Sequence, residues 1–359
     1  MSKIPRSCLF LRIKSGNPGV MTPLTKQLLH CLRDNVLPKI PLAVCEGAGG
    51  KMLLAGEERW TRYFLQRFHG AEWTRQEFGL FRAWQLPAAV RRHRGSVDLT
   101  LVRLDPVSIR MLGMREFLSV PEWIRMVAPV PAPDAPVPIR SARDDLRAIR
   151  KNGLFWRVSR DPGDLRIYLE RDYYPYTRRR YGDDAFVQPP SVMWRAFRKG
   201  GLMFVEDGAR PIGGMVFELR QNILQMWSMA CMDSDEAHLN RKALAAVYAF
   251  SFECARTLGM DFVDMRGSRP CPVDPLFSVK HKWGARVREH GETAFELLFD
   301  WKEVNVAVQR FLGKTPLIFW DAGRLSVIGT SESEGSIRWR EAGLRRFAAT
   351  ESGPSIFSS

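Results

Sequence analysis

The sequence predicts a mixed α/β (α+β) fold, and three neighbouring features carry the prediction. Between residues 201 and 231 three short apolar runs are separated by turn residues, the pattern of an antiparallel meander. Residues 239–258 then carry apolar side chains nearly all round at helical spacing, which indicates a buried helix. The run 261–266 returns as a strand, and a strand, helix, strand order implies a parallel crossover.

The chain before the meander is expected to form an N-terminal α/β domain of unknown role, residues 1–127. It mixes helical periodicity in "TKQLLHCLRDNVL" with a strand-like run in "SVDLTLVRL". The stretch "GAGGK" at 47–51 resembles a phosphate loop. It lacks the spacing of a P-loop and the Ser or Thr after the lysine, so a glycine turn explains it better.

A proline-rich connector is expected at residues 128–140, where five prolines forbid a helix. The second domain should follow at 141–327, starting with a short basic helix whose capping box begins at Ser141. Residues 328–359 are then a polar C-terminal tail, within which "RWREAGLRRF" is consistent with a peripheral helix.

The composition restricts the function classes. The 359 residues are 45% hydrophobic and carry a formal charge of +15, which suits an anionic partner such as nucleic acid, a phosphorylated cofactor or a membrane surface, or serves only solubility. Six cysteines without a CxxC pair speak against a zinc site or a disulfide framework. No run reaches the ~18 apolar residues of a membrane span. A cytoplasmic protein without a metal is therefore expected, and its oligomeric state stays open.

The stretch "PLFSVKHKWGARV", residues 275–287, mixes large apolar side chains with cations. We expect Leu276, Phe277 and Trp283 to pack inward. Lys280 could then lie in a partly desolvated cleft and stabilise an oxyanion or a phosphate. The alternative is a segment whose lysines extend to solvent.

Four stretches resemble the GNAT acyltransferase superfamily, in particular the branch of the FemAB/FemX peptidyltransferases and related acetyltransferase domains. They are "YLERDYYPYTRRRYG", "RPIGGMVFEL", "HLNRKALAAVYAFSFECARTLGMDFVDMRGS" and "LFSVKHKWGARV", within residues 141–300. In the last stretch Lys280 stands in the family's lysine position and Trp283-Gly284 in its aromatic-glycine position, whereas Val279 replaces the usual Phe.

The resemblance implies an N-acyltransferase that moves an acyl group, acetyl above all, from an acyl-CoA donor to a small-molecule or peptide amine by direct attack. One departure affects the donor: "SDEAHLNRKALA" replaces the glycine-containing pyrophosphate loop of the superfamily. An aminoacyl-tRNA donor, as in Fem-type aminoacyl or peptidyltransferases, is the alternative. A non-catalytic module that binds nucleic acid through its arginines is the second alternative.

Lys280 and Asp264 are the candidate catalytic residues, with Asp264 as the proton acceptor for the attacking amine. Asp264 and Arg266 alternate on one strand, so both could face the cleft, with an ion pair between them as the alternative.

The start of the central helix should bind the donor, because cations and backbone N–H groups meet at a helix N-terminus. The cofactor-binding candidates there are Asn240, Arg241 and Lys242. Aromatic residues interleaved with arginines suit stacking and phosphate contacts. The substrate-binding candidates are Arg266, Tyr173, Tyr176 and Arg180.

Overall fold

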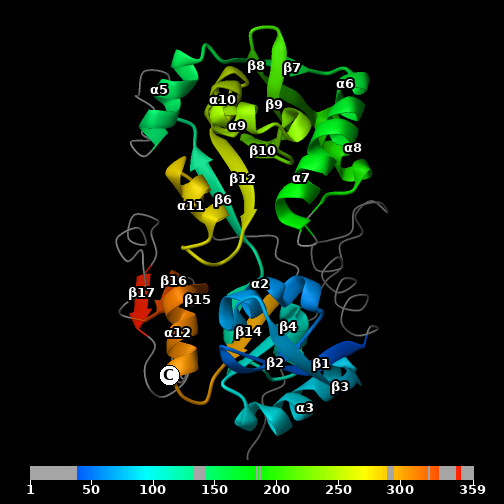
Figure 1. Cartoon of the computed structure of the whole chain (residues 1–359), viewed down its shortest axis with the longest axis vertical. Helices are drawn as coiled ribbons and strands as arrows, with labels where there is room; N and C mark the ends of the chain where they lie inside the picture. Colours follow the sequence, from blue (N-terminus) through cyan, green and yellow to red (C-terminus); the bar gives the residue numbers. More distant parts are fainter. Residues whose placement is uncertain are drawn as a thin grey trace, which may run out of the picture.

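The computed structural model describes residues 39–132, 142–182, 185, 187–288, 295–321 and 324–330, and the backbone of 345–348. The expected helix in "TKQLLHCLRDNVL", the cap at Ser141 and most of the C-terminal tail lie outside the described residues. Two lobes are visible, one above the other in Figure 1.

A six-stranded sheet forms the first lobe, in the order β3-β1-β2-β4-β14-β5. Its strands are β1 (Ile40–Gly47), β2 (Gly50–Ala55), β3 (Trp73–Phe81), β4 (Leu99–Leu104), β5 (Leu118–Pro121) and β14 (Glu296–Asp300). Its helices are α2 (Glu58–His69), α3 (Leu86–His93), α4 (Pro106–Met111) and α12 (Val306–Lys314). The "GAGGK" stretch is the turn between β1 and β2, where Gly47 is opposite Gly50.

The sheet pairing departs from the expected domain boundaries. β14 pairs with β4 and β5, so residues 296–300 join the first lobe although the sequence places them in the second domain. Leu297 and Phe299 of β14 are fully buried in the core of the first lobe, which this pairing completes. The tail contributes a strand where a helix was expected: β17 (Arg345–Ala348) pairs with β16 (Arg324–Gly329), which also pairs with β15 (Leu317–Asp321).

The second lobe holds a sheet in the order β13-β6-β12-β10-β9-β8-β7, with β11 paired to β9. The strands are β6 (Ile124–Pro129), β7 (Phe155–Ser159), β8 (Gly200–Asp207), β9 (Arg210–Arg220), β10 (Ile223–Met226), β11 (Ala230–Cys231), β12 (Phe262–Ser268) and β13 (Arg286–Val287). β8, β9 and β10 are antiparallel neighbours, and β12 runs parallel to β10. This is the strand order that the sequence predicts. β6, however, takes in the start of the expected connector.

Helices cover both faces of this sheet. They are α5 (Arg143–Lys151), α6 (Pro162–Ile167), the π-helical turn η5 (Tyr168–Tyr173), α7 (Tyr174–Tyr181), α8 (Pro190–Lys199), α9 (Glu236–Asn240), α10 (Ala243–Thr257) and α11 (Pro275–Lys282). The neighbouring glycines of β9 permit close approach on either side. A Cβ on Gly213 would lie 3.4 Å from Val247 of α10, and one on Gly214 would lie 2.9 Å from Tyr168.

The expected single helix 239–258 is in fact two helices, α9 and α10. The break lies at Lys242, whose φ of 73° is left-handed and cannot continue a helix. α5 likewise differs from expectation, because its N-cap is Ala142 and no side chain caps it.

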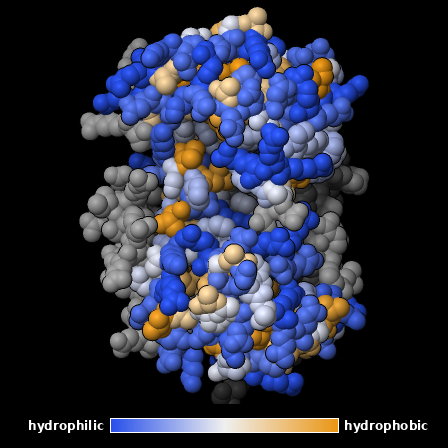
Figure 2. Space-filling view, in the orientation of Figure 1, coloured by the Kyte–Doolittle hydropathy of each residue, from blue (hydrophilic) through white to orange (hydrophobic). Residues whose placement is uncertain are grey.

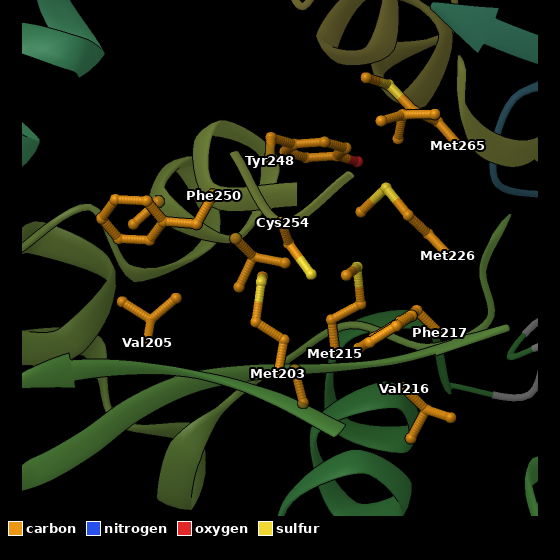
Figure 3. Close-up of a cluster of buried hydrophobic side chains, with 14 of the residues drawn as sticks. Met203, Val205, Met215, Val216, Phe217, Met226, Tyr248, Phe250, Cys254 and Met265 are labelled. Atoms are coloured by element: carbon orange, nitrogen blue, oxygen red, sulfur yellow. The ribbon is translucent and has the colours of Figure 1, made fainter. Parts of the chain in front are cut away.

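The core of the second lobe is rich in sulfur. Met203, Met215 and Cys254 fill the space between the meander and α10, and Met226 and Met265 continue this cluster (Figure 3). The surface of both lobes is mostly hydrophilic, with small apolar groups, some of them where the lobes meet (Figure 2). No helix among the described residues is long and apolar enough to cross a membrane.

Candidate active site

The parallel strands β10 and β12 separate after three paired residues, the last pair being Gln225 and Asp264. β10 ends one residue later, and the N–H of Trp227 turns to the carbonyl of Val216 on β9. In β12, Arg266 has a left-handed φ of 64°, and the pairing with β6 shifts register nearby. A gap therefore opens between the two strands at their carboxyl ends.

A cavity of about 440 Å³ occupies this gap and receives side chains from both faces of the sheet. Its wall consists of Trp123, Ile124, Arg125, Tyr173, Thr177, Tyr181, Gln188, Met226, Trp227, Ser228, Met229, Tyr248, Met265, Arg266, Gly267, Leu276 and Lys280. α10 and α11 supply one side, and η5 and α7 supply the other.

The charged and apolar stretch found in the sequence forms α11 and the residues after it. Asp274 caps the helix by accepting from the N–H groups of Leu276 and Phe277, at 3.0 and 3.1 Å. Phe277 and Trp283 are buried, and the Trp283 ring is stacked on Tyr248 with 5.9 Å between centroids. These apolar contacts hold α11 against α10 and direct Lys280 to the cavity wall.

Lys280 is 4% exposed. Its Nζ donates to the carbonyls of Arg266 and Gly267, at 3.3 and 2.5 Å, and its third hydrogen has no acceptor among the described residues. Burial lowers the pKa of Lys280 to about 7. The carboxylates of Asp264 and Asp274 oppose that effect and Arg266 adds to it. Both protonation states are therefore populated near neutral pH.

Asp264 lies behind the wall rather than in it. It is fully buried, and its Oδ2 accepts from Nε and Nη2 of Arg125, at 2.7 and 2.5 Å. Its Oδ1 accepts from the N–H of Arg266, at 2.8 Å. With both oxygens engaged, Asp264 is placed to position Arg125 and the β12 backbone, not to receive a proton from a ligand.

Arg266, in contrast, does reach the cavity. Its guanidinium lies over the Trp227 ring, 4.0 Å from the centroid, and 3.9 Å from Oδ2 of Asp264. Asp264 and Arg266 do not both face the cavity, because only Arg266 lines it. The alternative reading of the sequence, an ion pair between the two residues, agrees with the 3.9 Å contact.

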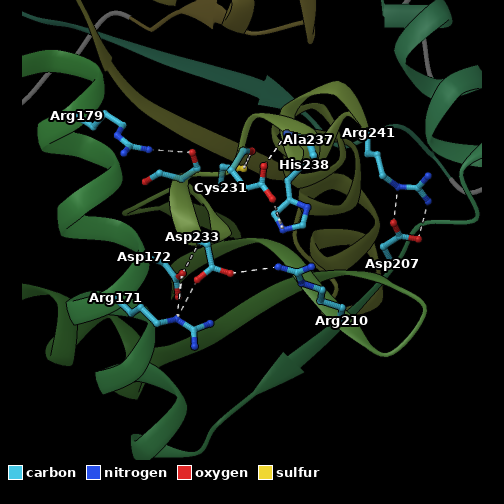
Figure 4. A network of polar contacts seen from close by, with 12 residues as sticks. Arg171, Asp172, Arg179, Asp207, Arg210, Cys231, Asp233, Ala237, His238 and Arg241 are labelled. Carbon is cyan, nitrogen blue, oxygen red and sulfur yellow. Dashed lines mark hydrogen bonds and ion pairs between the residues drawn. The ribbon is translucent and has the colours of Figure 1, made fainter.

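The expected donor site at the start of α10 already holds two ion pairs. Arg241 pairs with Asp207 (Figure 4), and Lys242 lies 3.3 Å from Asp145. Asn240 is exposed at the end of α9. None of these three candidates lines the 440 Å³ cavity.

Carboxylates also lie before α10. Asp233, Asp235 and Glu236 are among the residues that precede it. Asp233 receives the guanidinium groups of Arg171 and Arg210, at 3.3 and 3.5 Å (Figure 4). The local cations are thus matched by local carboxylates.

The tyrosine and arginine candidates divide between two hollows. Tyr173 lines the 440 Å³ cavity, as Lys280 does, and burial raises the pKa of the Tyr173 hydroxyl to about 12. Tyr176 and Arg180 line a second hollow of about 740 Å³ beside α9. There Arg180 donates to the Tyr176 hydroxyl at 3.0 Å. The structure therefore places Lys280, Arg266 and Tyr173 on the wall of one cavity, with Asp264 directly behind it. The remaining candidates, which are Tyr176, Arg180, Asn240, Arg241 and Lys242, do not line that cavity.

Several wall residues were missed from the sequence. Arg125 has no local signal, because it meets Asp264 139 residues away. The sequence predicts one strand through Trp227 in "ILQMWSMAC", residues 223–231, whereas β10 ends at Met226. The polar residues within that apolar run were the available signal that the strand ends early. Among the described residues no group of three His, Cys, Asp or Glu side chains could hold a metal ion.

No protein-family model matches the sequence, and no curated protein matches it. Several solved structures resemble the chain over most of its length. L-PGS from Bacillus licheniformis has 11% identity and a TM-score of 0.38, over 82% of this chain and 96% of that one. FemX has 11% identity and a TM-score of 0.39, over 76% of this chain and 90% of the FemX chain. A GCN5-related N-acetyltransferase from Sphaerobacter thermophilus has 12% identity and a TM-score of 0.32, over 69% of this chain and 71% of that one.

Proposed function

We propose that the chain is an N-acyltransferase, which moves an acyl group from an activated ester or thioester donor to an amine by direct attack. The observation that carries the proposal is the buried Lys280 at the wall of the cavity between β10 and β12. A buried cation at a cavity wall can stabilise charge that develops on a ligand, and such stabilisation is worth roughly 3 to 4 kcal/mol for one donor in other enzymes.

In the proposed reaction the amine attacks the donor carbonyl, and the oxyanion that forms accepts the third N–H of protonated Lys280. The new C–N bond forms, the bond from the carbonyl carbon to sulfur or oxygen breaks, and the leaving group takes up the proton that the amine loses. The two faces of the sheet allow donor and acceptor to approach from opposite sides. Tyr248 lines the same cavity, but we assign the proton transfer to no residue.

The pH dependence of turnover tests the role of Lys280. An oxyanion partner must be protonated, so kcat/KM should fall as the pH rises through about 7, the pKa of Lys280. If neutral Lys280 acted instead as a base, kcat/KM would rise through the same range. Lys280→Met should remove the part of the pH profile of kcat/KM that depends on Lys280. It should also lower kcat more than it weakens donor binding.

The donor is the point at which two candidate functions separate. The sequence resemblance favours acyl-CoA, acetyl-CoA first. Arg241 and Lys242 are already paired with carboxylates, which argues against a CoA site at the start of α10, so an aminoacyl-tRNA ester is the second candidate. The +15 charge of the chain is compatible with a tRNA partner.

Incubation of the protein with acyl-CoAs and charged tRNAs, followed by product analysis, distinguishes the donors. The double variant Arg241→Ala, Lys242→Ala should leave turnover of an aminoacyl-tRNA unchanged if the donor does not bind at the start of α10. A marked, salt-dependent loss of CoA binding in that variant would return the assignment to acyl-CoA. If wild type binds nucleic acid without turnover of any donor, and Lys280→Met binds it equally well, the chain is a non-catalytic nucleic-acid-binding module.

A further inference from the structure

We infer that the acyl group which this cavity accepts is apolar and longer than acetyl. The inference rests on the proposed function and adds the class of the transferred group. It follows from the apolar side chains of the wall, from the space that they enclose, and from the charges around that space.

An apolar end of the cavity lies between the separating strands. Met226 of β10 and Met265 of β12 converge on the space toward which the Tyr248 hydroxyl points (Figure 3). Met229 and Leu276 belong to the same wall. Methionine side chains are flexible and polarisable, so they adapt to apolar groups of irregular shape.

The space exceeds what an acetyl group needs. The cavity measures about 440 Å³, and it has to hold the reacting end of the donor and the amine as well as the acyl group. An acetyl group has three heavy atoms. Its single methyl group can cover only part of the Met226 and Met265 side chains, whereas a longer apolar chain covers more of them and removes more apolar surface from water.

The charges around the cavity select against a cationic acyl group. Arg125, Arg266 and Lys280 all line it, and no carboxylate is among the described lining residues. Both oxygens of the nearby Asp264 are engaged by Arg125 and by the backbone of Arg266. An acyl group with an ammonium side chain would meet like charge without a partner, which disfavours lysyl and favours aliphatic or aromatic groups.

A donor series tests the inference on the wild-type protein. Each buried methylene contributes about fourfold in binding, so butyryl-CoA should exceed acetyl-CoA in kcat/KM by about 15-fold, with hexanoyl-CoA higher still. For ester donors, leucyl-tRNA should be used in preference to lysyl-tRNA. Equal or better use of acetyl, or a preference for lysyl, would overturn the inference while the acyltransferase function stands.

A variant that fills the apolar end provides a second test. Met229 is half-buried and lines the cavity, so Met229→Trp should abolish the preference for the longer acyl group. Met111→Trp is the matched control, because Met111 is 79% exposed on α4 of the other lobe, and it should keep the wild-type preference. An unchanged preference in a folded Met229→Trp protein would contradict the placement of the acyl group.

Binding of a simple probe separates failure of this inference from failure of the function. Octanoate combines an apolar chain with an anionic end, and it should bind to wild type, measured by tryptophan fluorescence, but not to Met229→Trp. Acetate should not bind to either. If octanoate binds in this way and no donor is turned over, the acyltransferase function is wrong and the apolar cavity stands. If octanoate fails to bind to wild type, the inference is wrong.

Discussion

Lys280→Met should change the pH dependence of folding stability, because burial gives Lys280 a lower pKa in the folded chain than in the unfolded one. An unfolded lysine titrates near 10.5, and burial lowers the folded pKa to about 7. Between these two pH values the unfolded chain binds a proton that the folded chain does not. Stability therefore rises with pH across this window, and below pH 7 both states are protonated and the slope disappears.

The magnitude follows from the two values. Each pH unit between them is worth about 1.36 kcal/mol, so the window from about 7 to 10.5 amounts to about 5 kcal/mol. Lys280→Met keeps much of the apolar stem and lacks the titrating amine. Its stability relative to wild type should thus be greatest at pH 7 or below and decline by about that amount as the pH rises to 10.5.

Urea unfolding of both proteins, followed by circular dichroism at several pH values from 6 to 10, measures this difference. Groups that titrate in both proteins cancel from the comparison. Val279→Met, on the exposed side of the same helix, is the control, and its stability relative to wild type should not vary with pH. A pH-independent difference between wild type and Lys280→Met would refute the claim that Lys280 is desolvated in the folded protein.

Three further substitutions test the scaffold of the site. Trp283→Ala should destabilise by roughly 3 to 5 kcal/mol in urea unfolding, since the indole is 1% exposed, and should lower activity only as folded protein is lost. Asp264→Asn leaves the Arg125 guanidinium with a neutral partner, so we expect about 3 to 5 kcal/mol lower stability, and an unchanged melting temperature would argue against the buried pair. Gly214→Ala would place a Cβ 2.9 Å from the buried Tyr168 ring. The free energy of unfolding should fall by about 1 to 3 kcal/mol, which would appear as a lower urea midpoint. An unchanged midpoint would show that the Tyr168 ring can move away without cost.

The sequence alone predicted the elements whose signals are local. Turn residues between short apolar runs located the meander, and apolar helical spacing located α10. The large side chains of "PLFSVKHKWGARV" predicted that Phe277 and Trp283 are buried and that Lys280 is drawn toward the protein interior. Each of these features depends on neighbours within a few turns or strands, so a single stretch of residues contains the information.

Tertiary structure decided which side chains meet. β14 completes the first sheet although it lies about 190 residues after its neighbour β4. The β14 sequence "ELLFD", residues 296–300, contains no signal that identifies β4 as its pairing partner. Arg266 reaches the cavity while Asp264, 3.9 Å from the Arg266 guanidinium, lies behind the wall, although their spacing in the strand suggested that both would face the cleft. Arg125 engages Asp264 from a strand on the other side of the expected domain boundary. Pairing over such distances depends on how whole elements pack, and hydrophobic periodicity within one element carries no record of the partner it will meet.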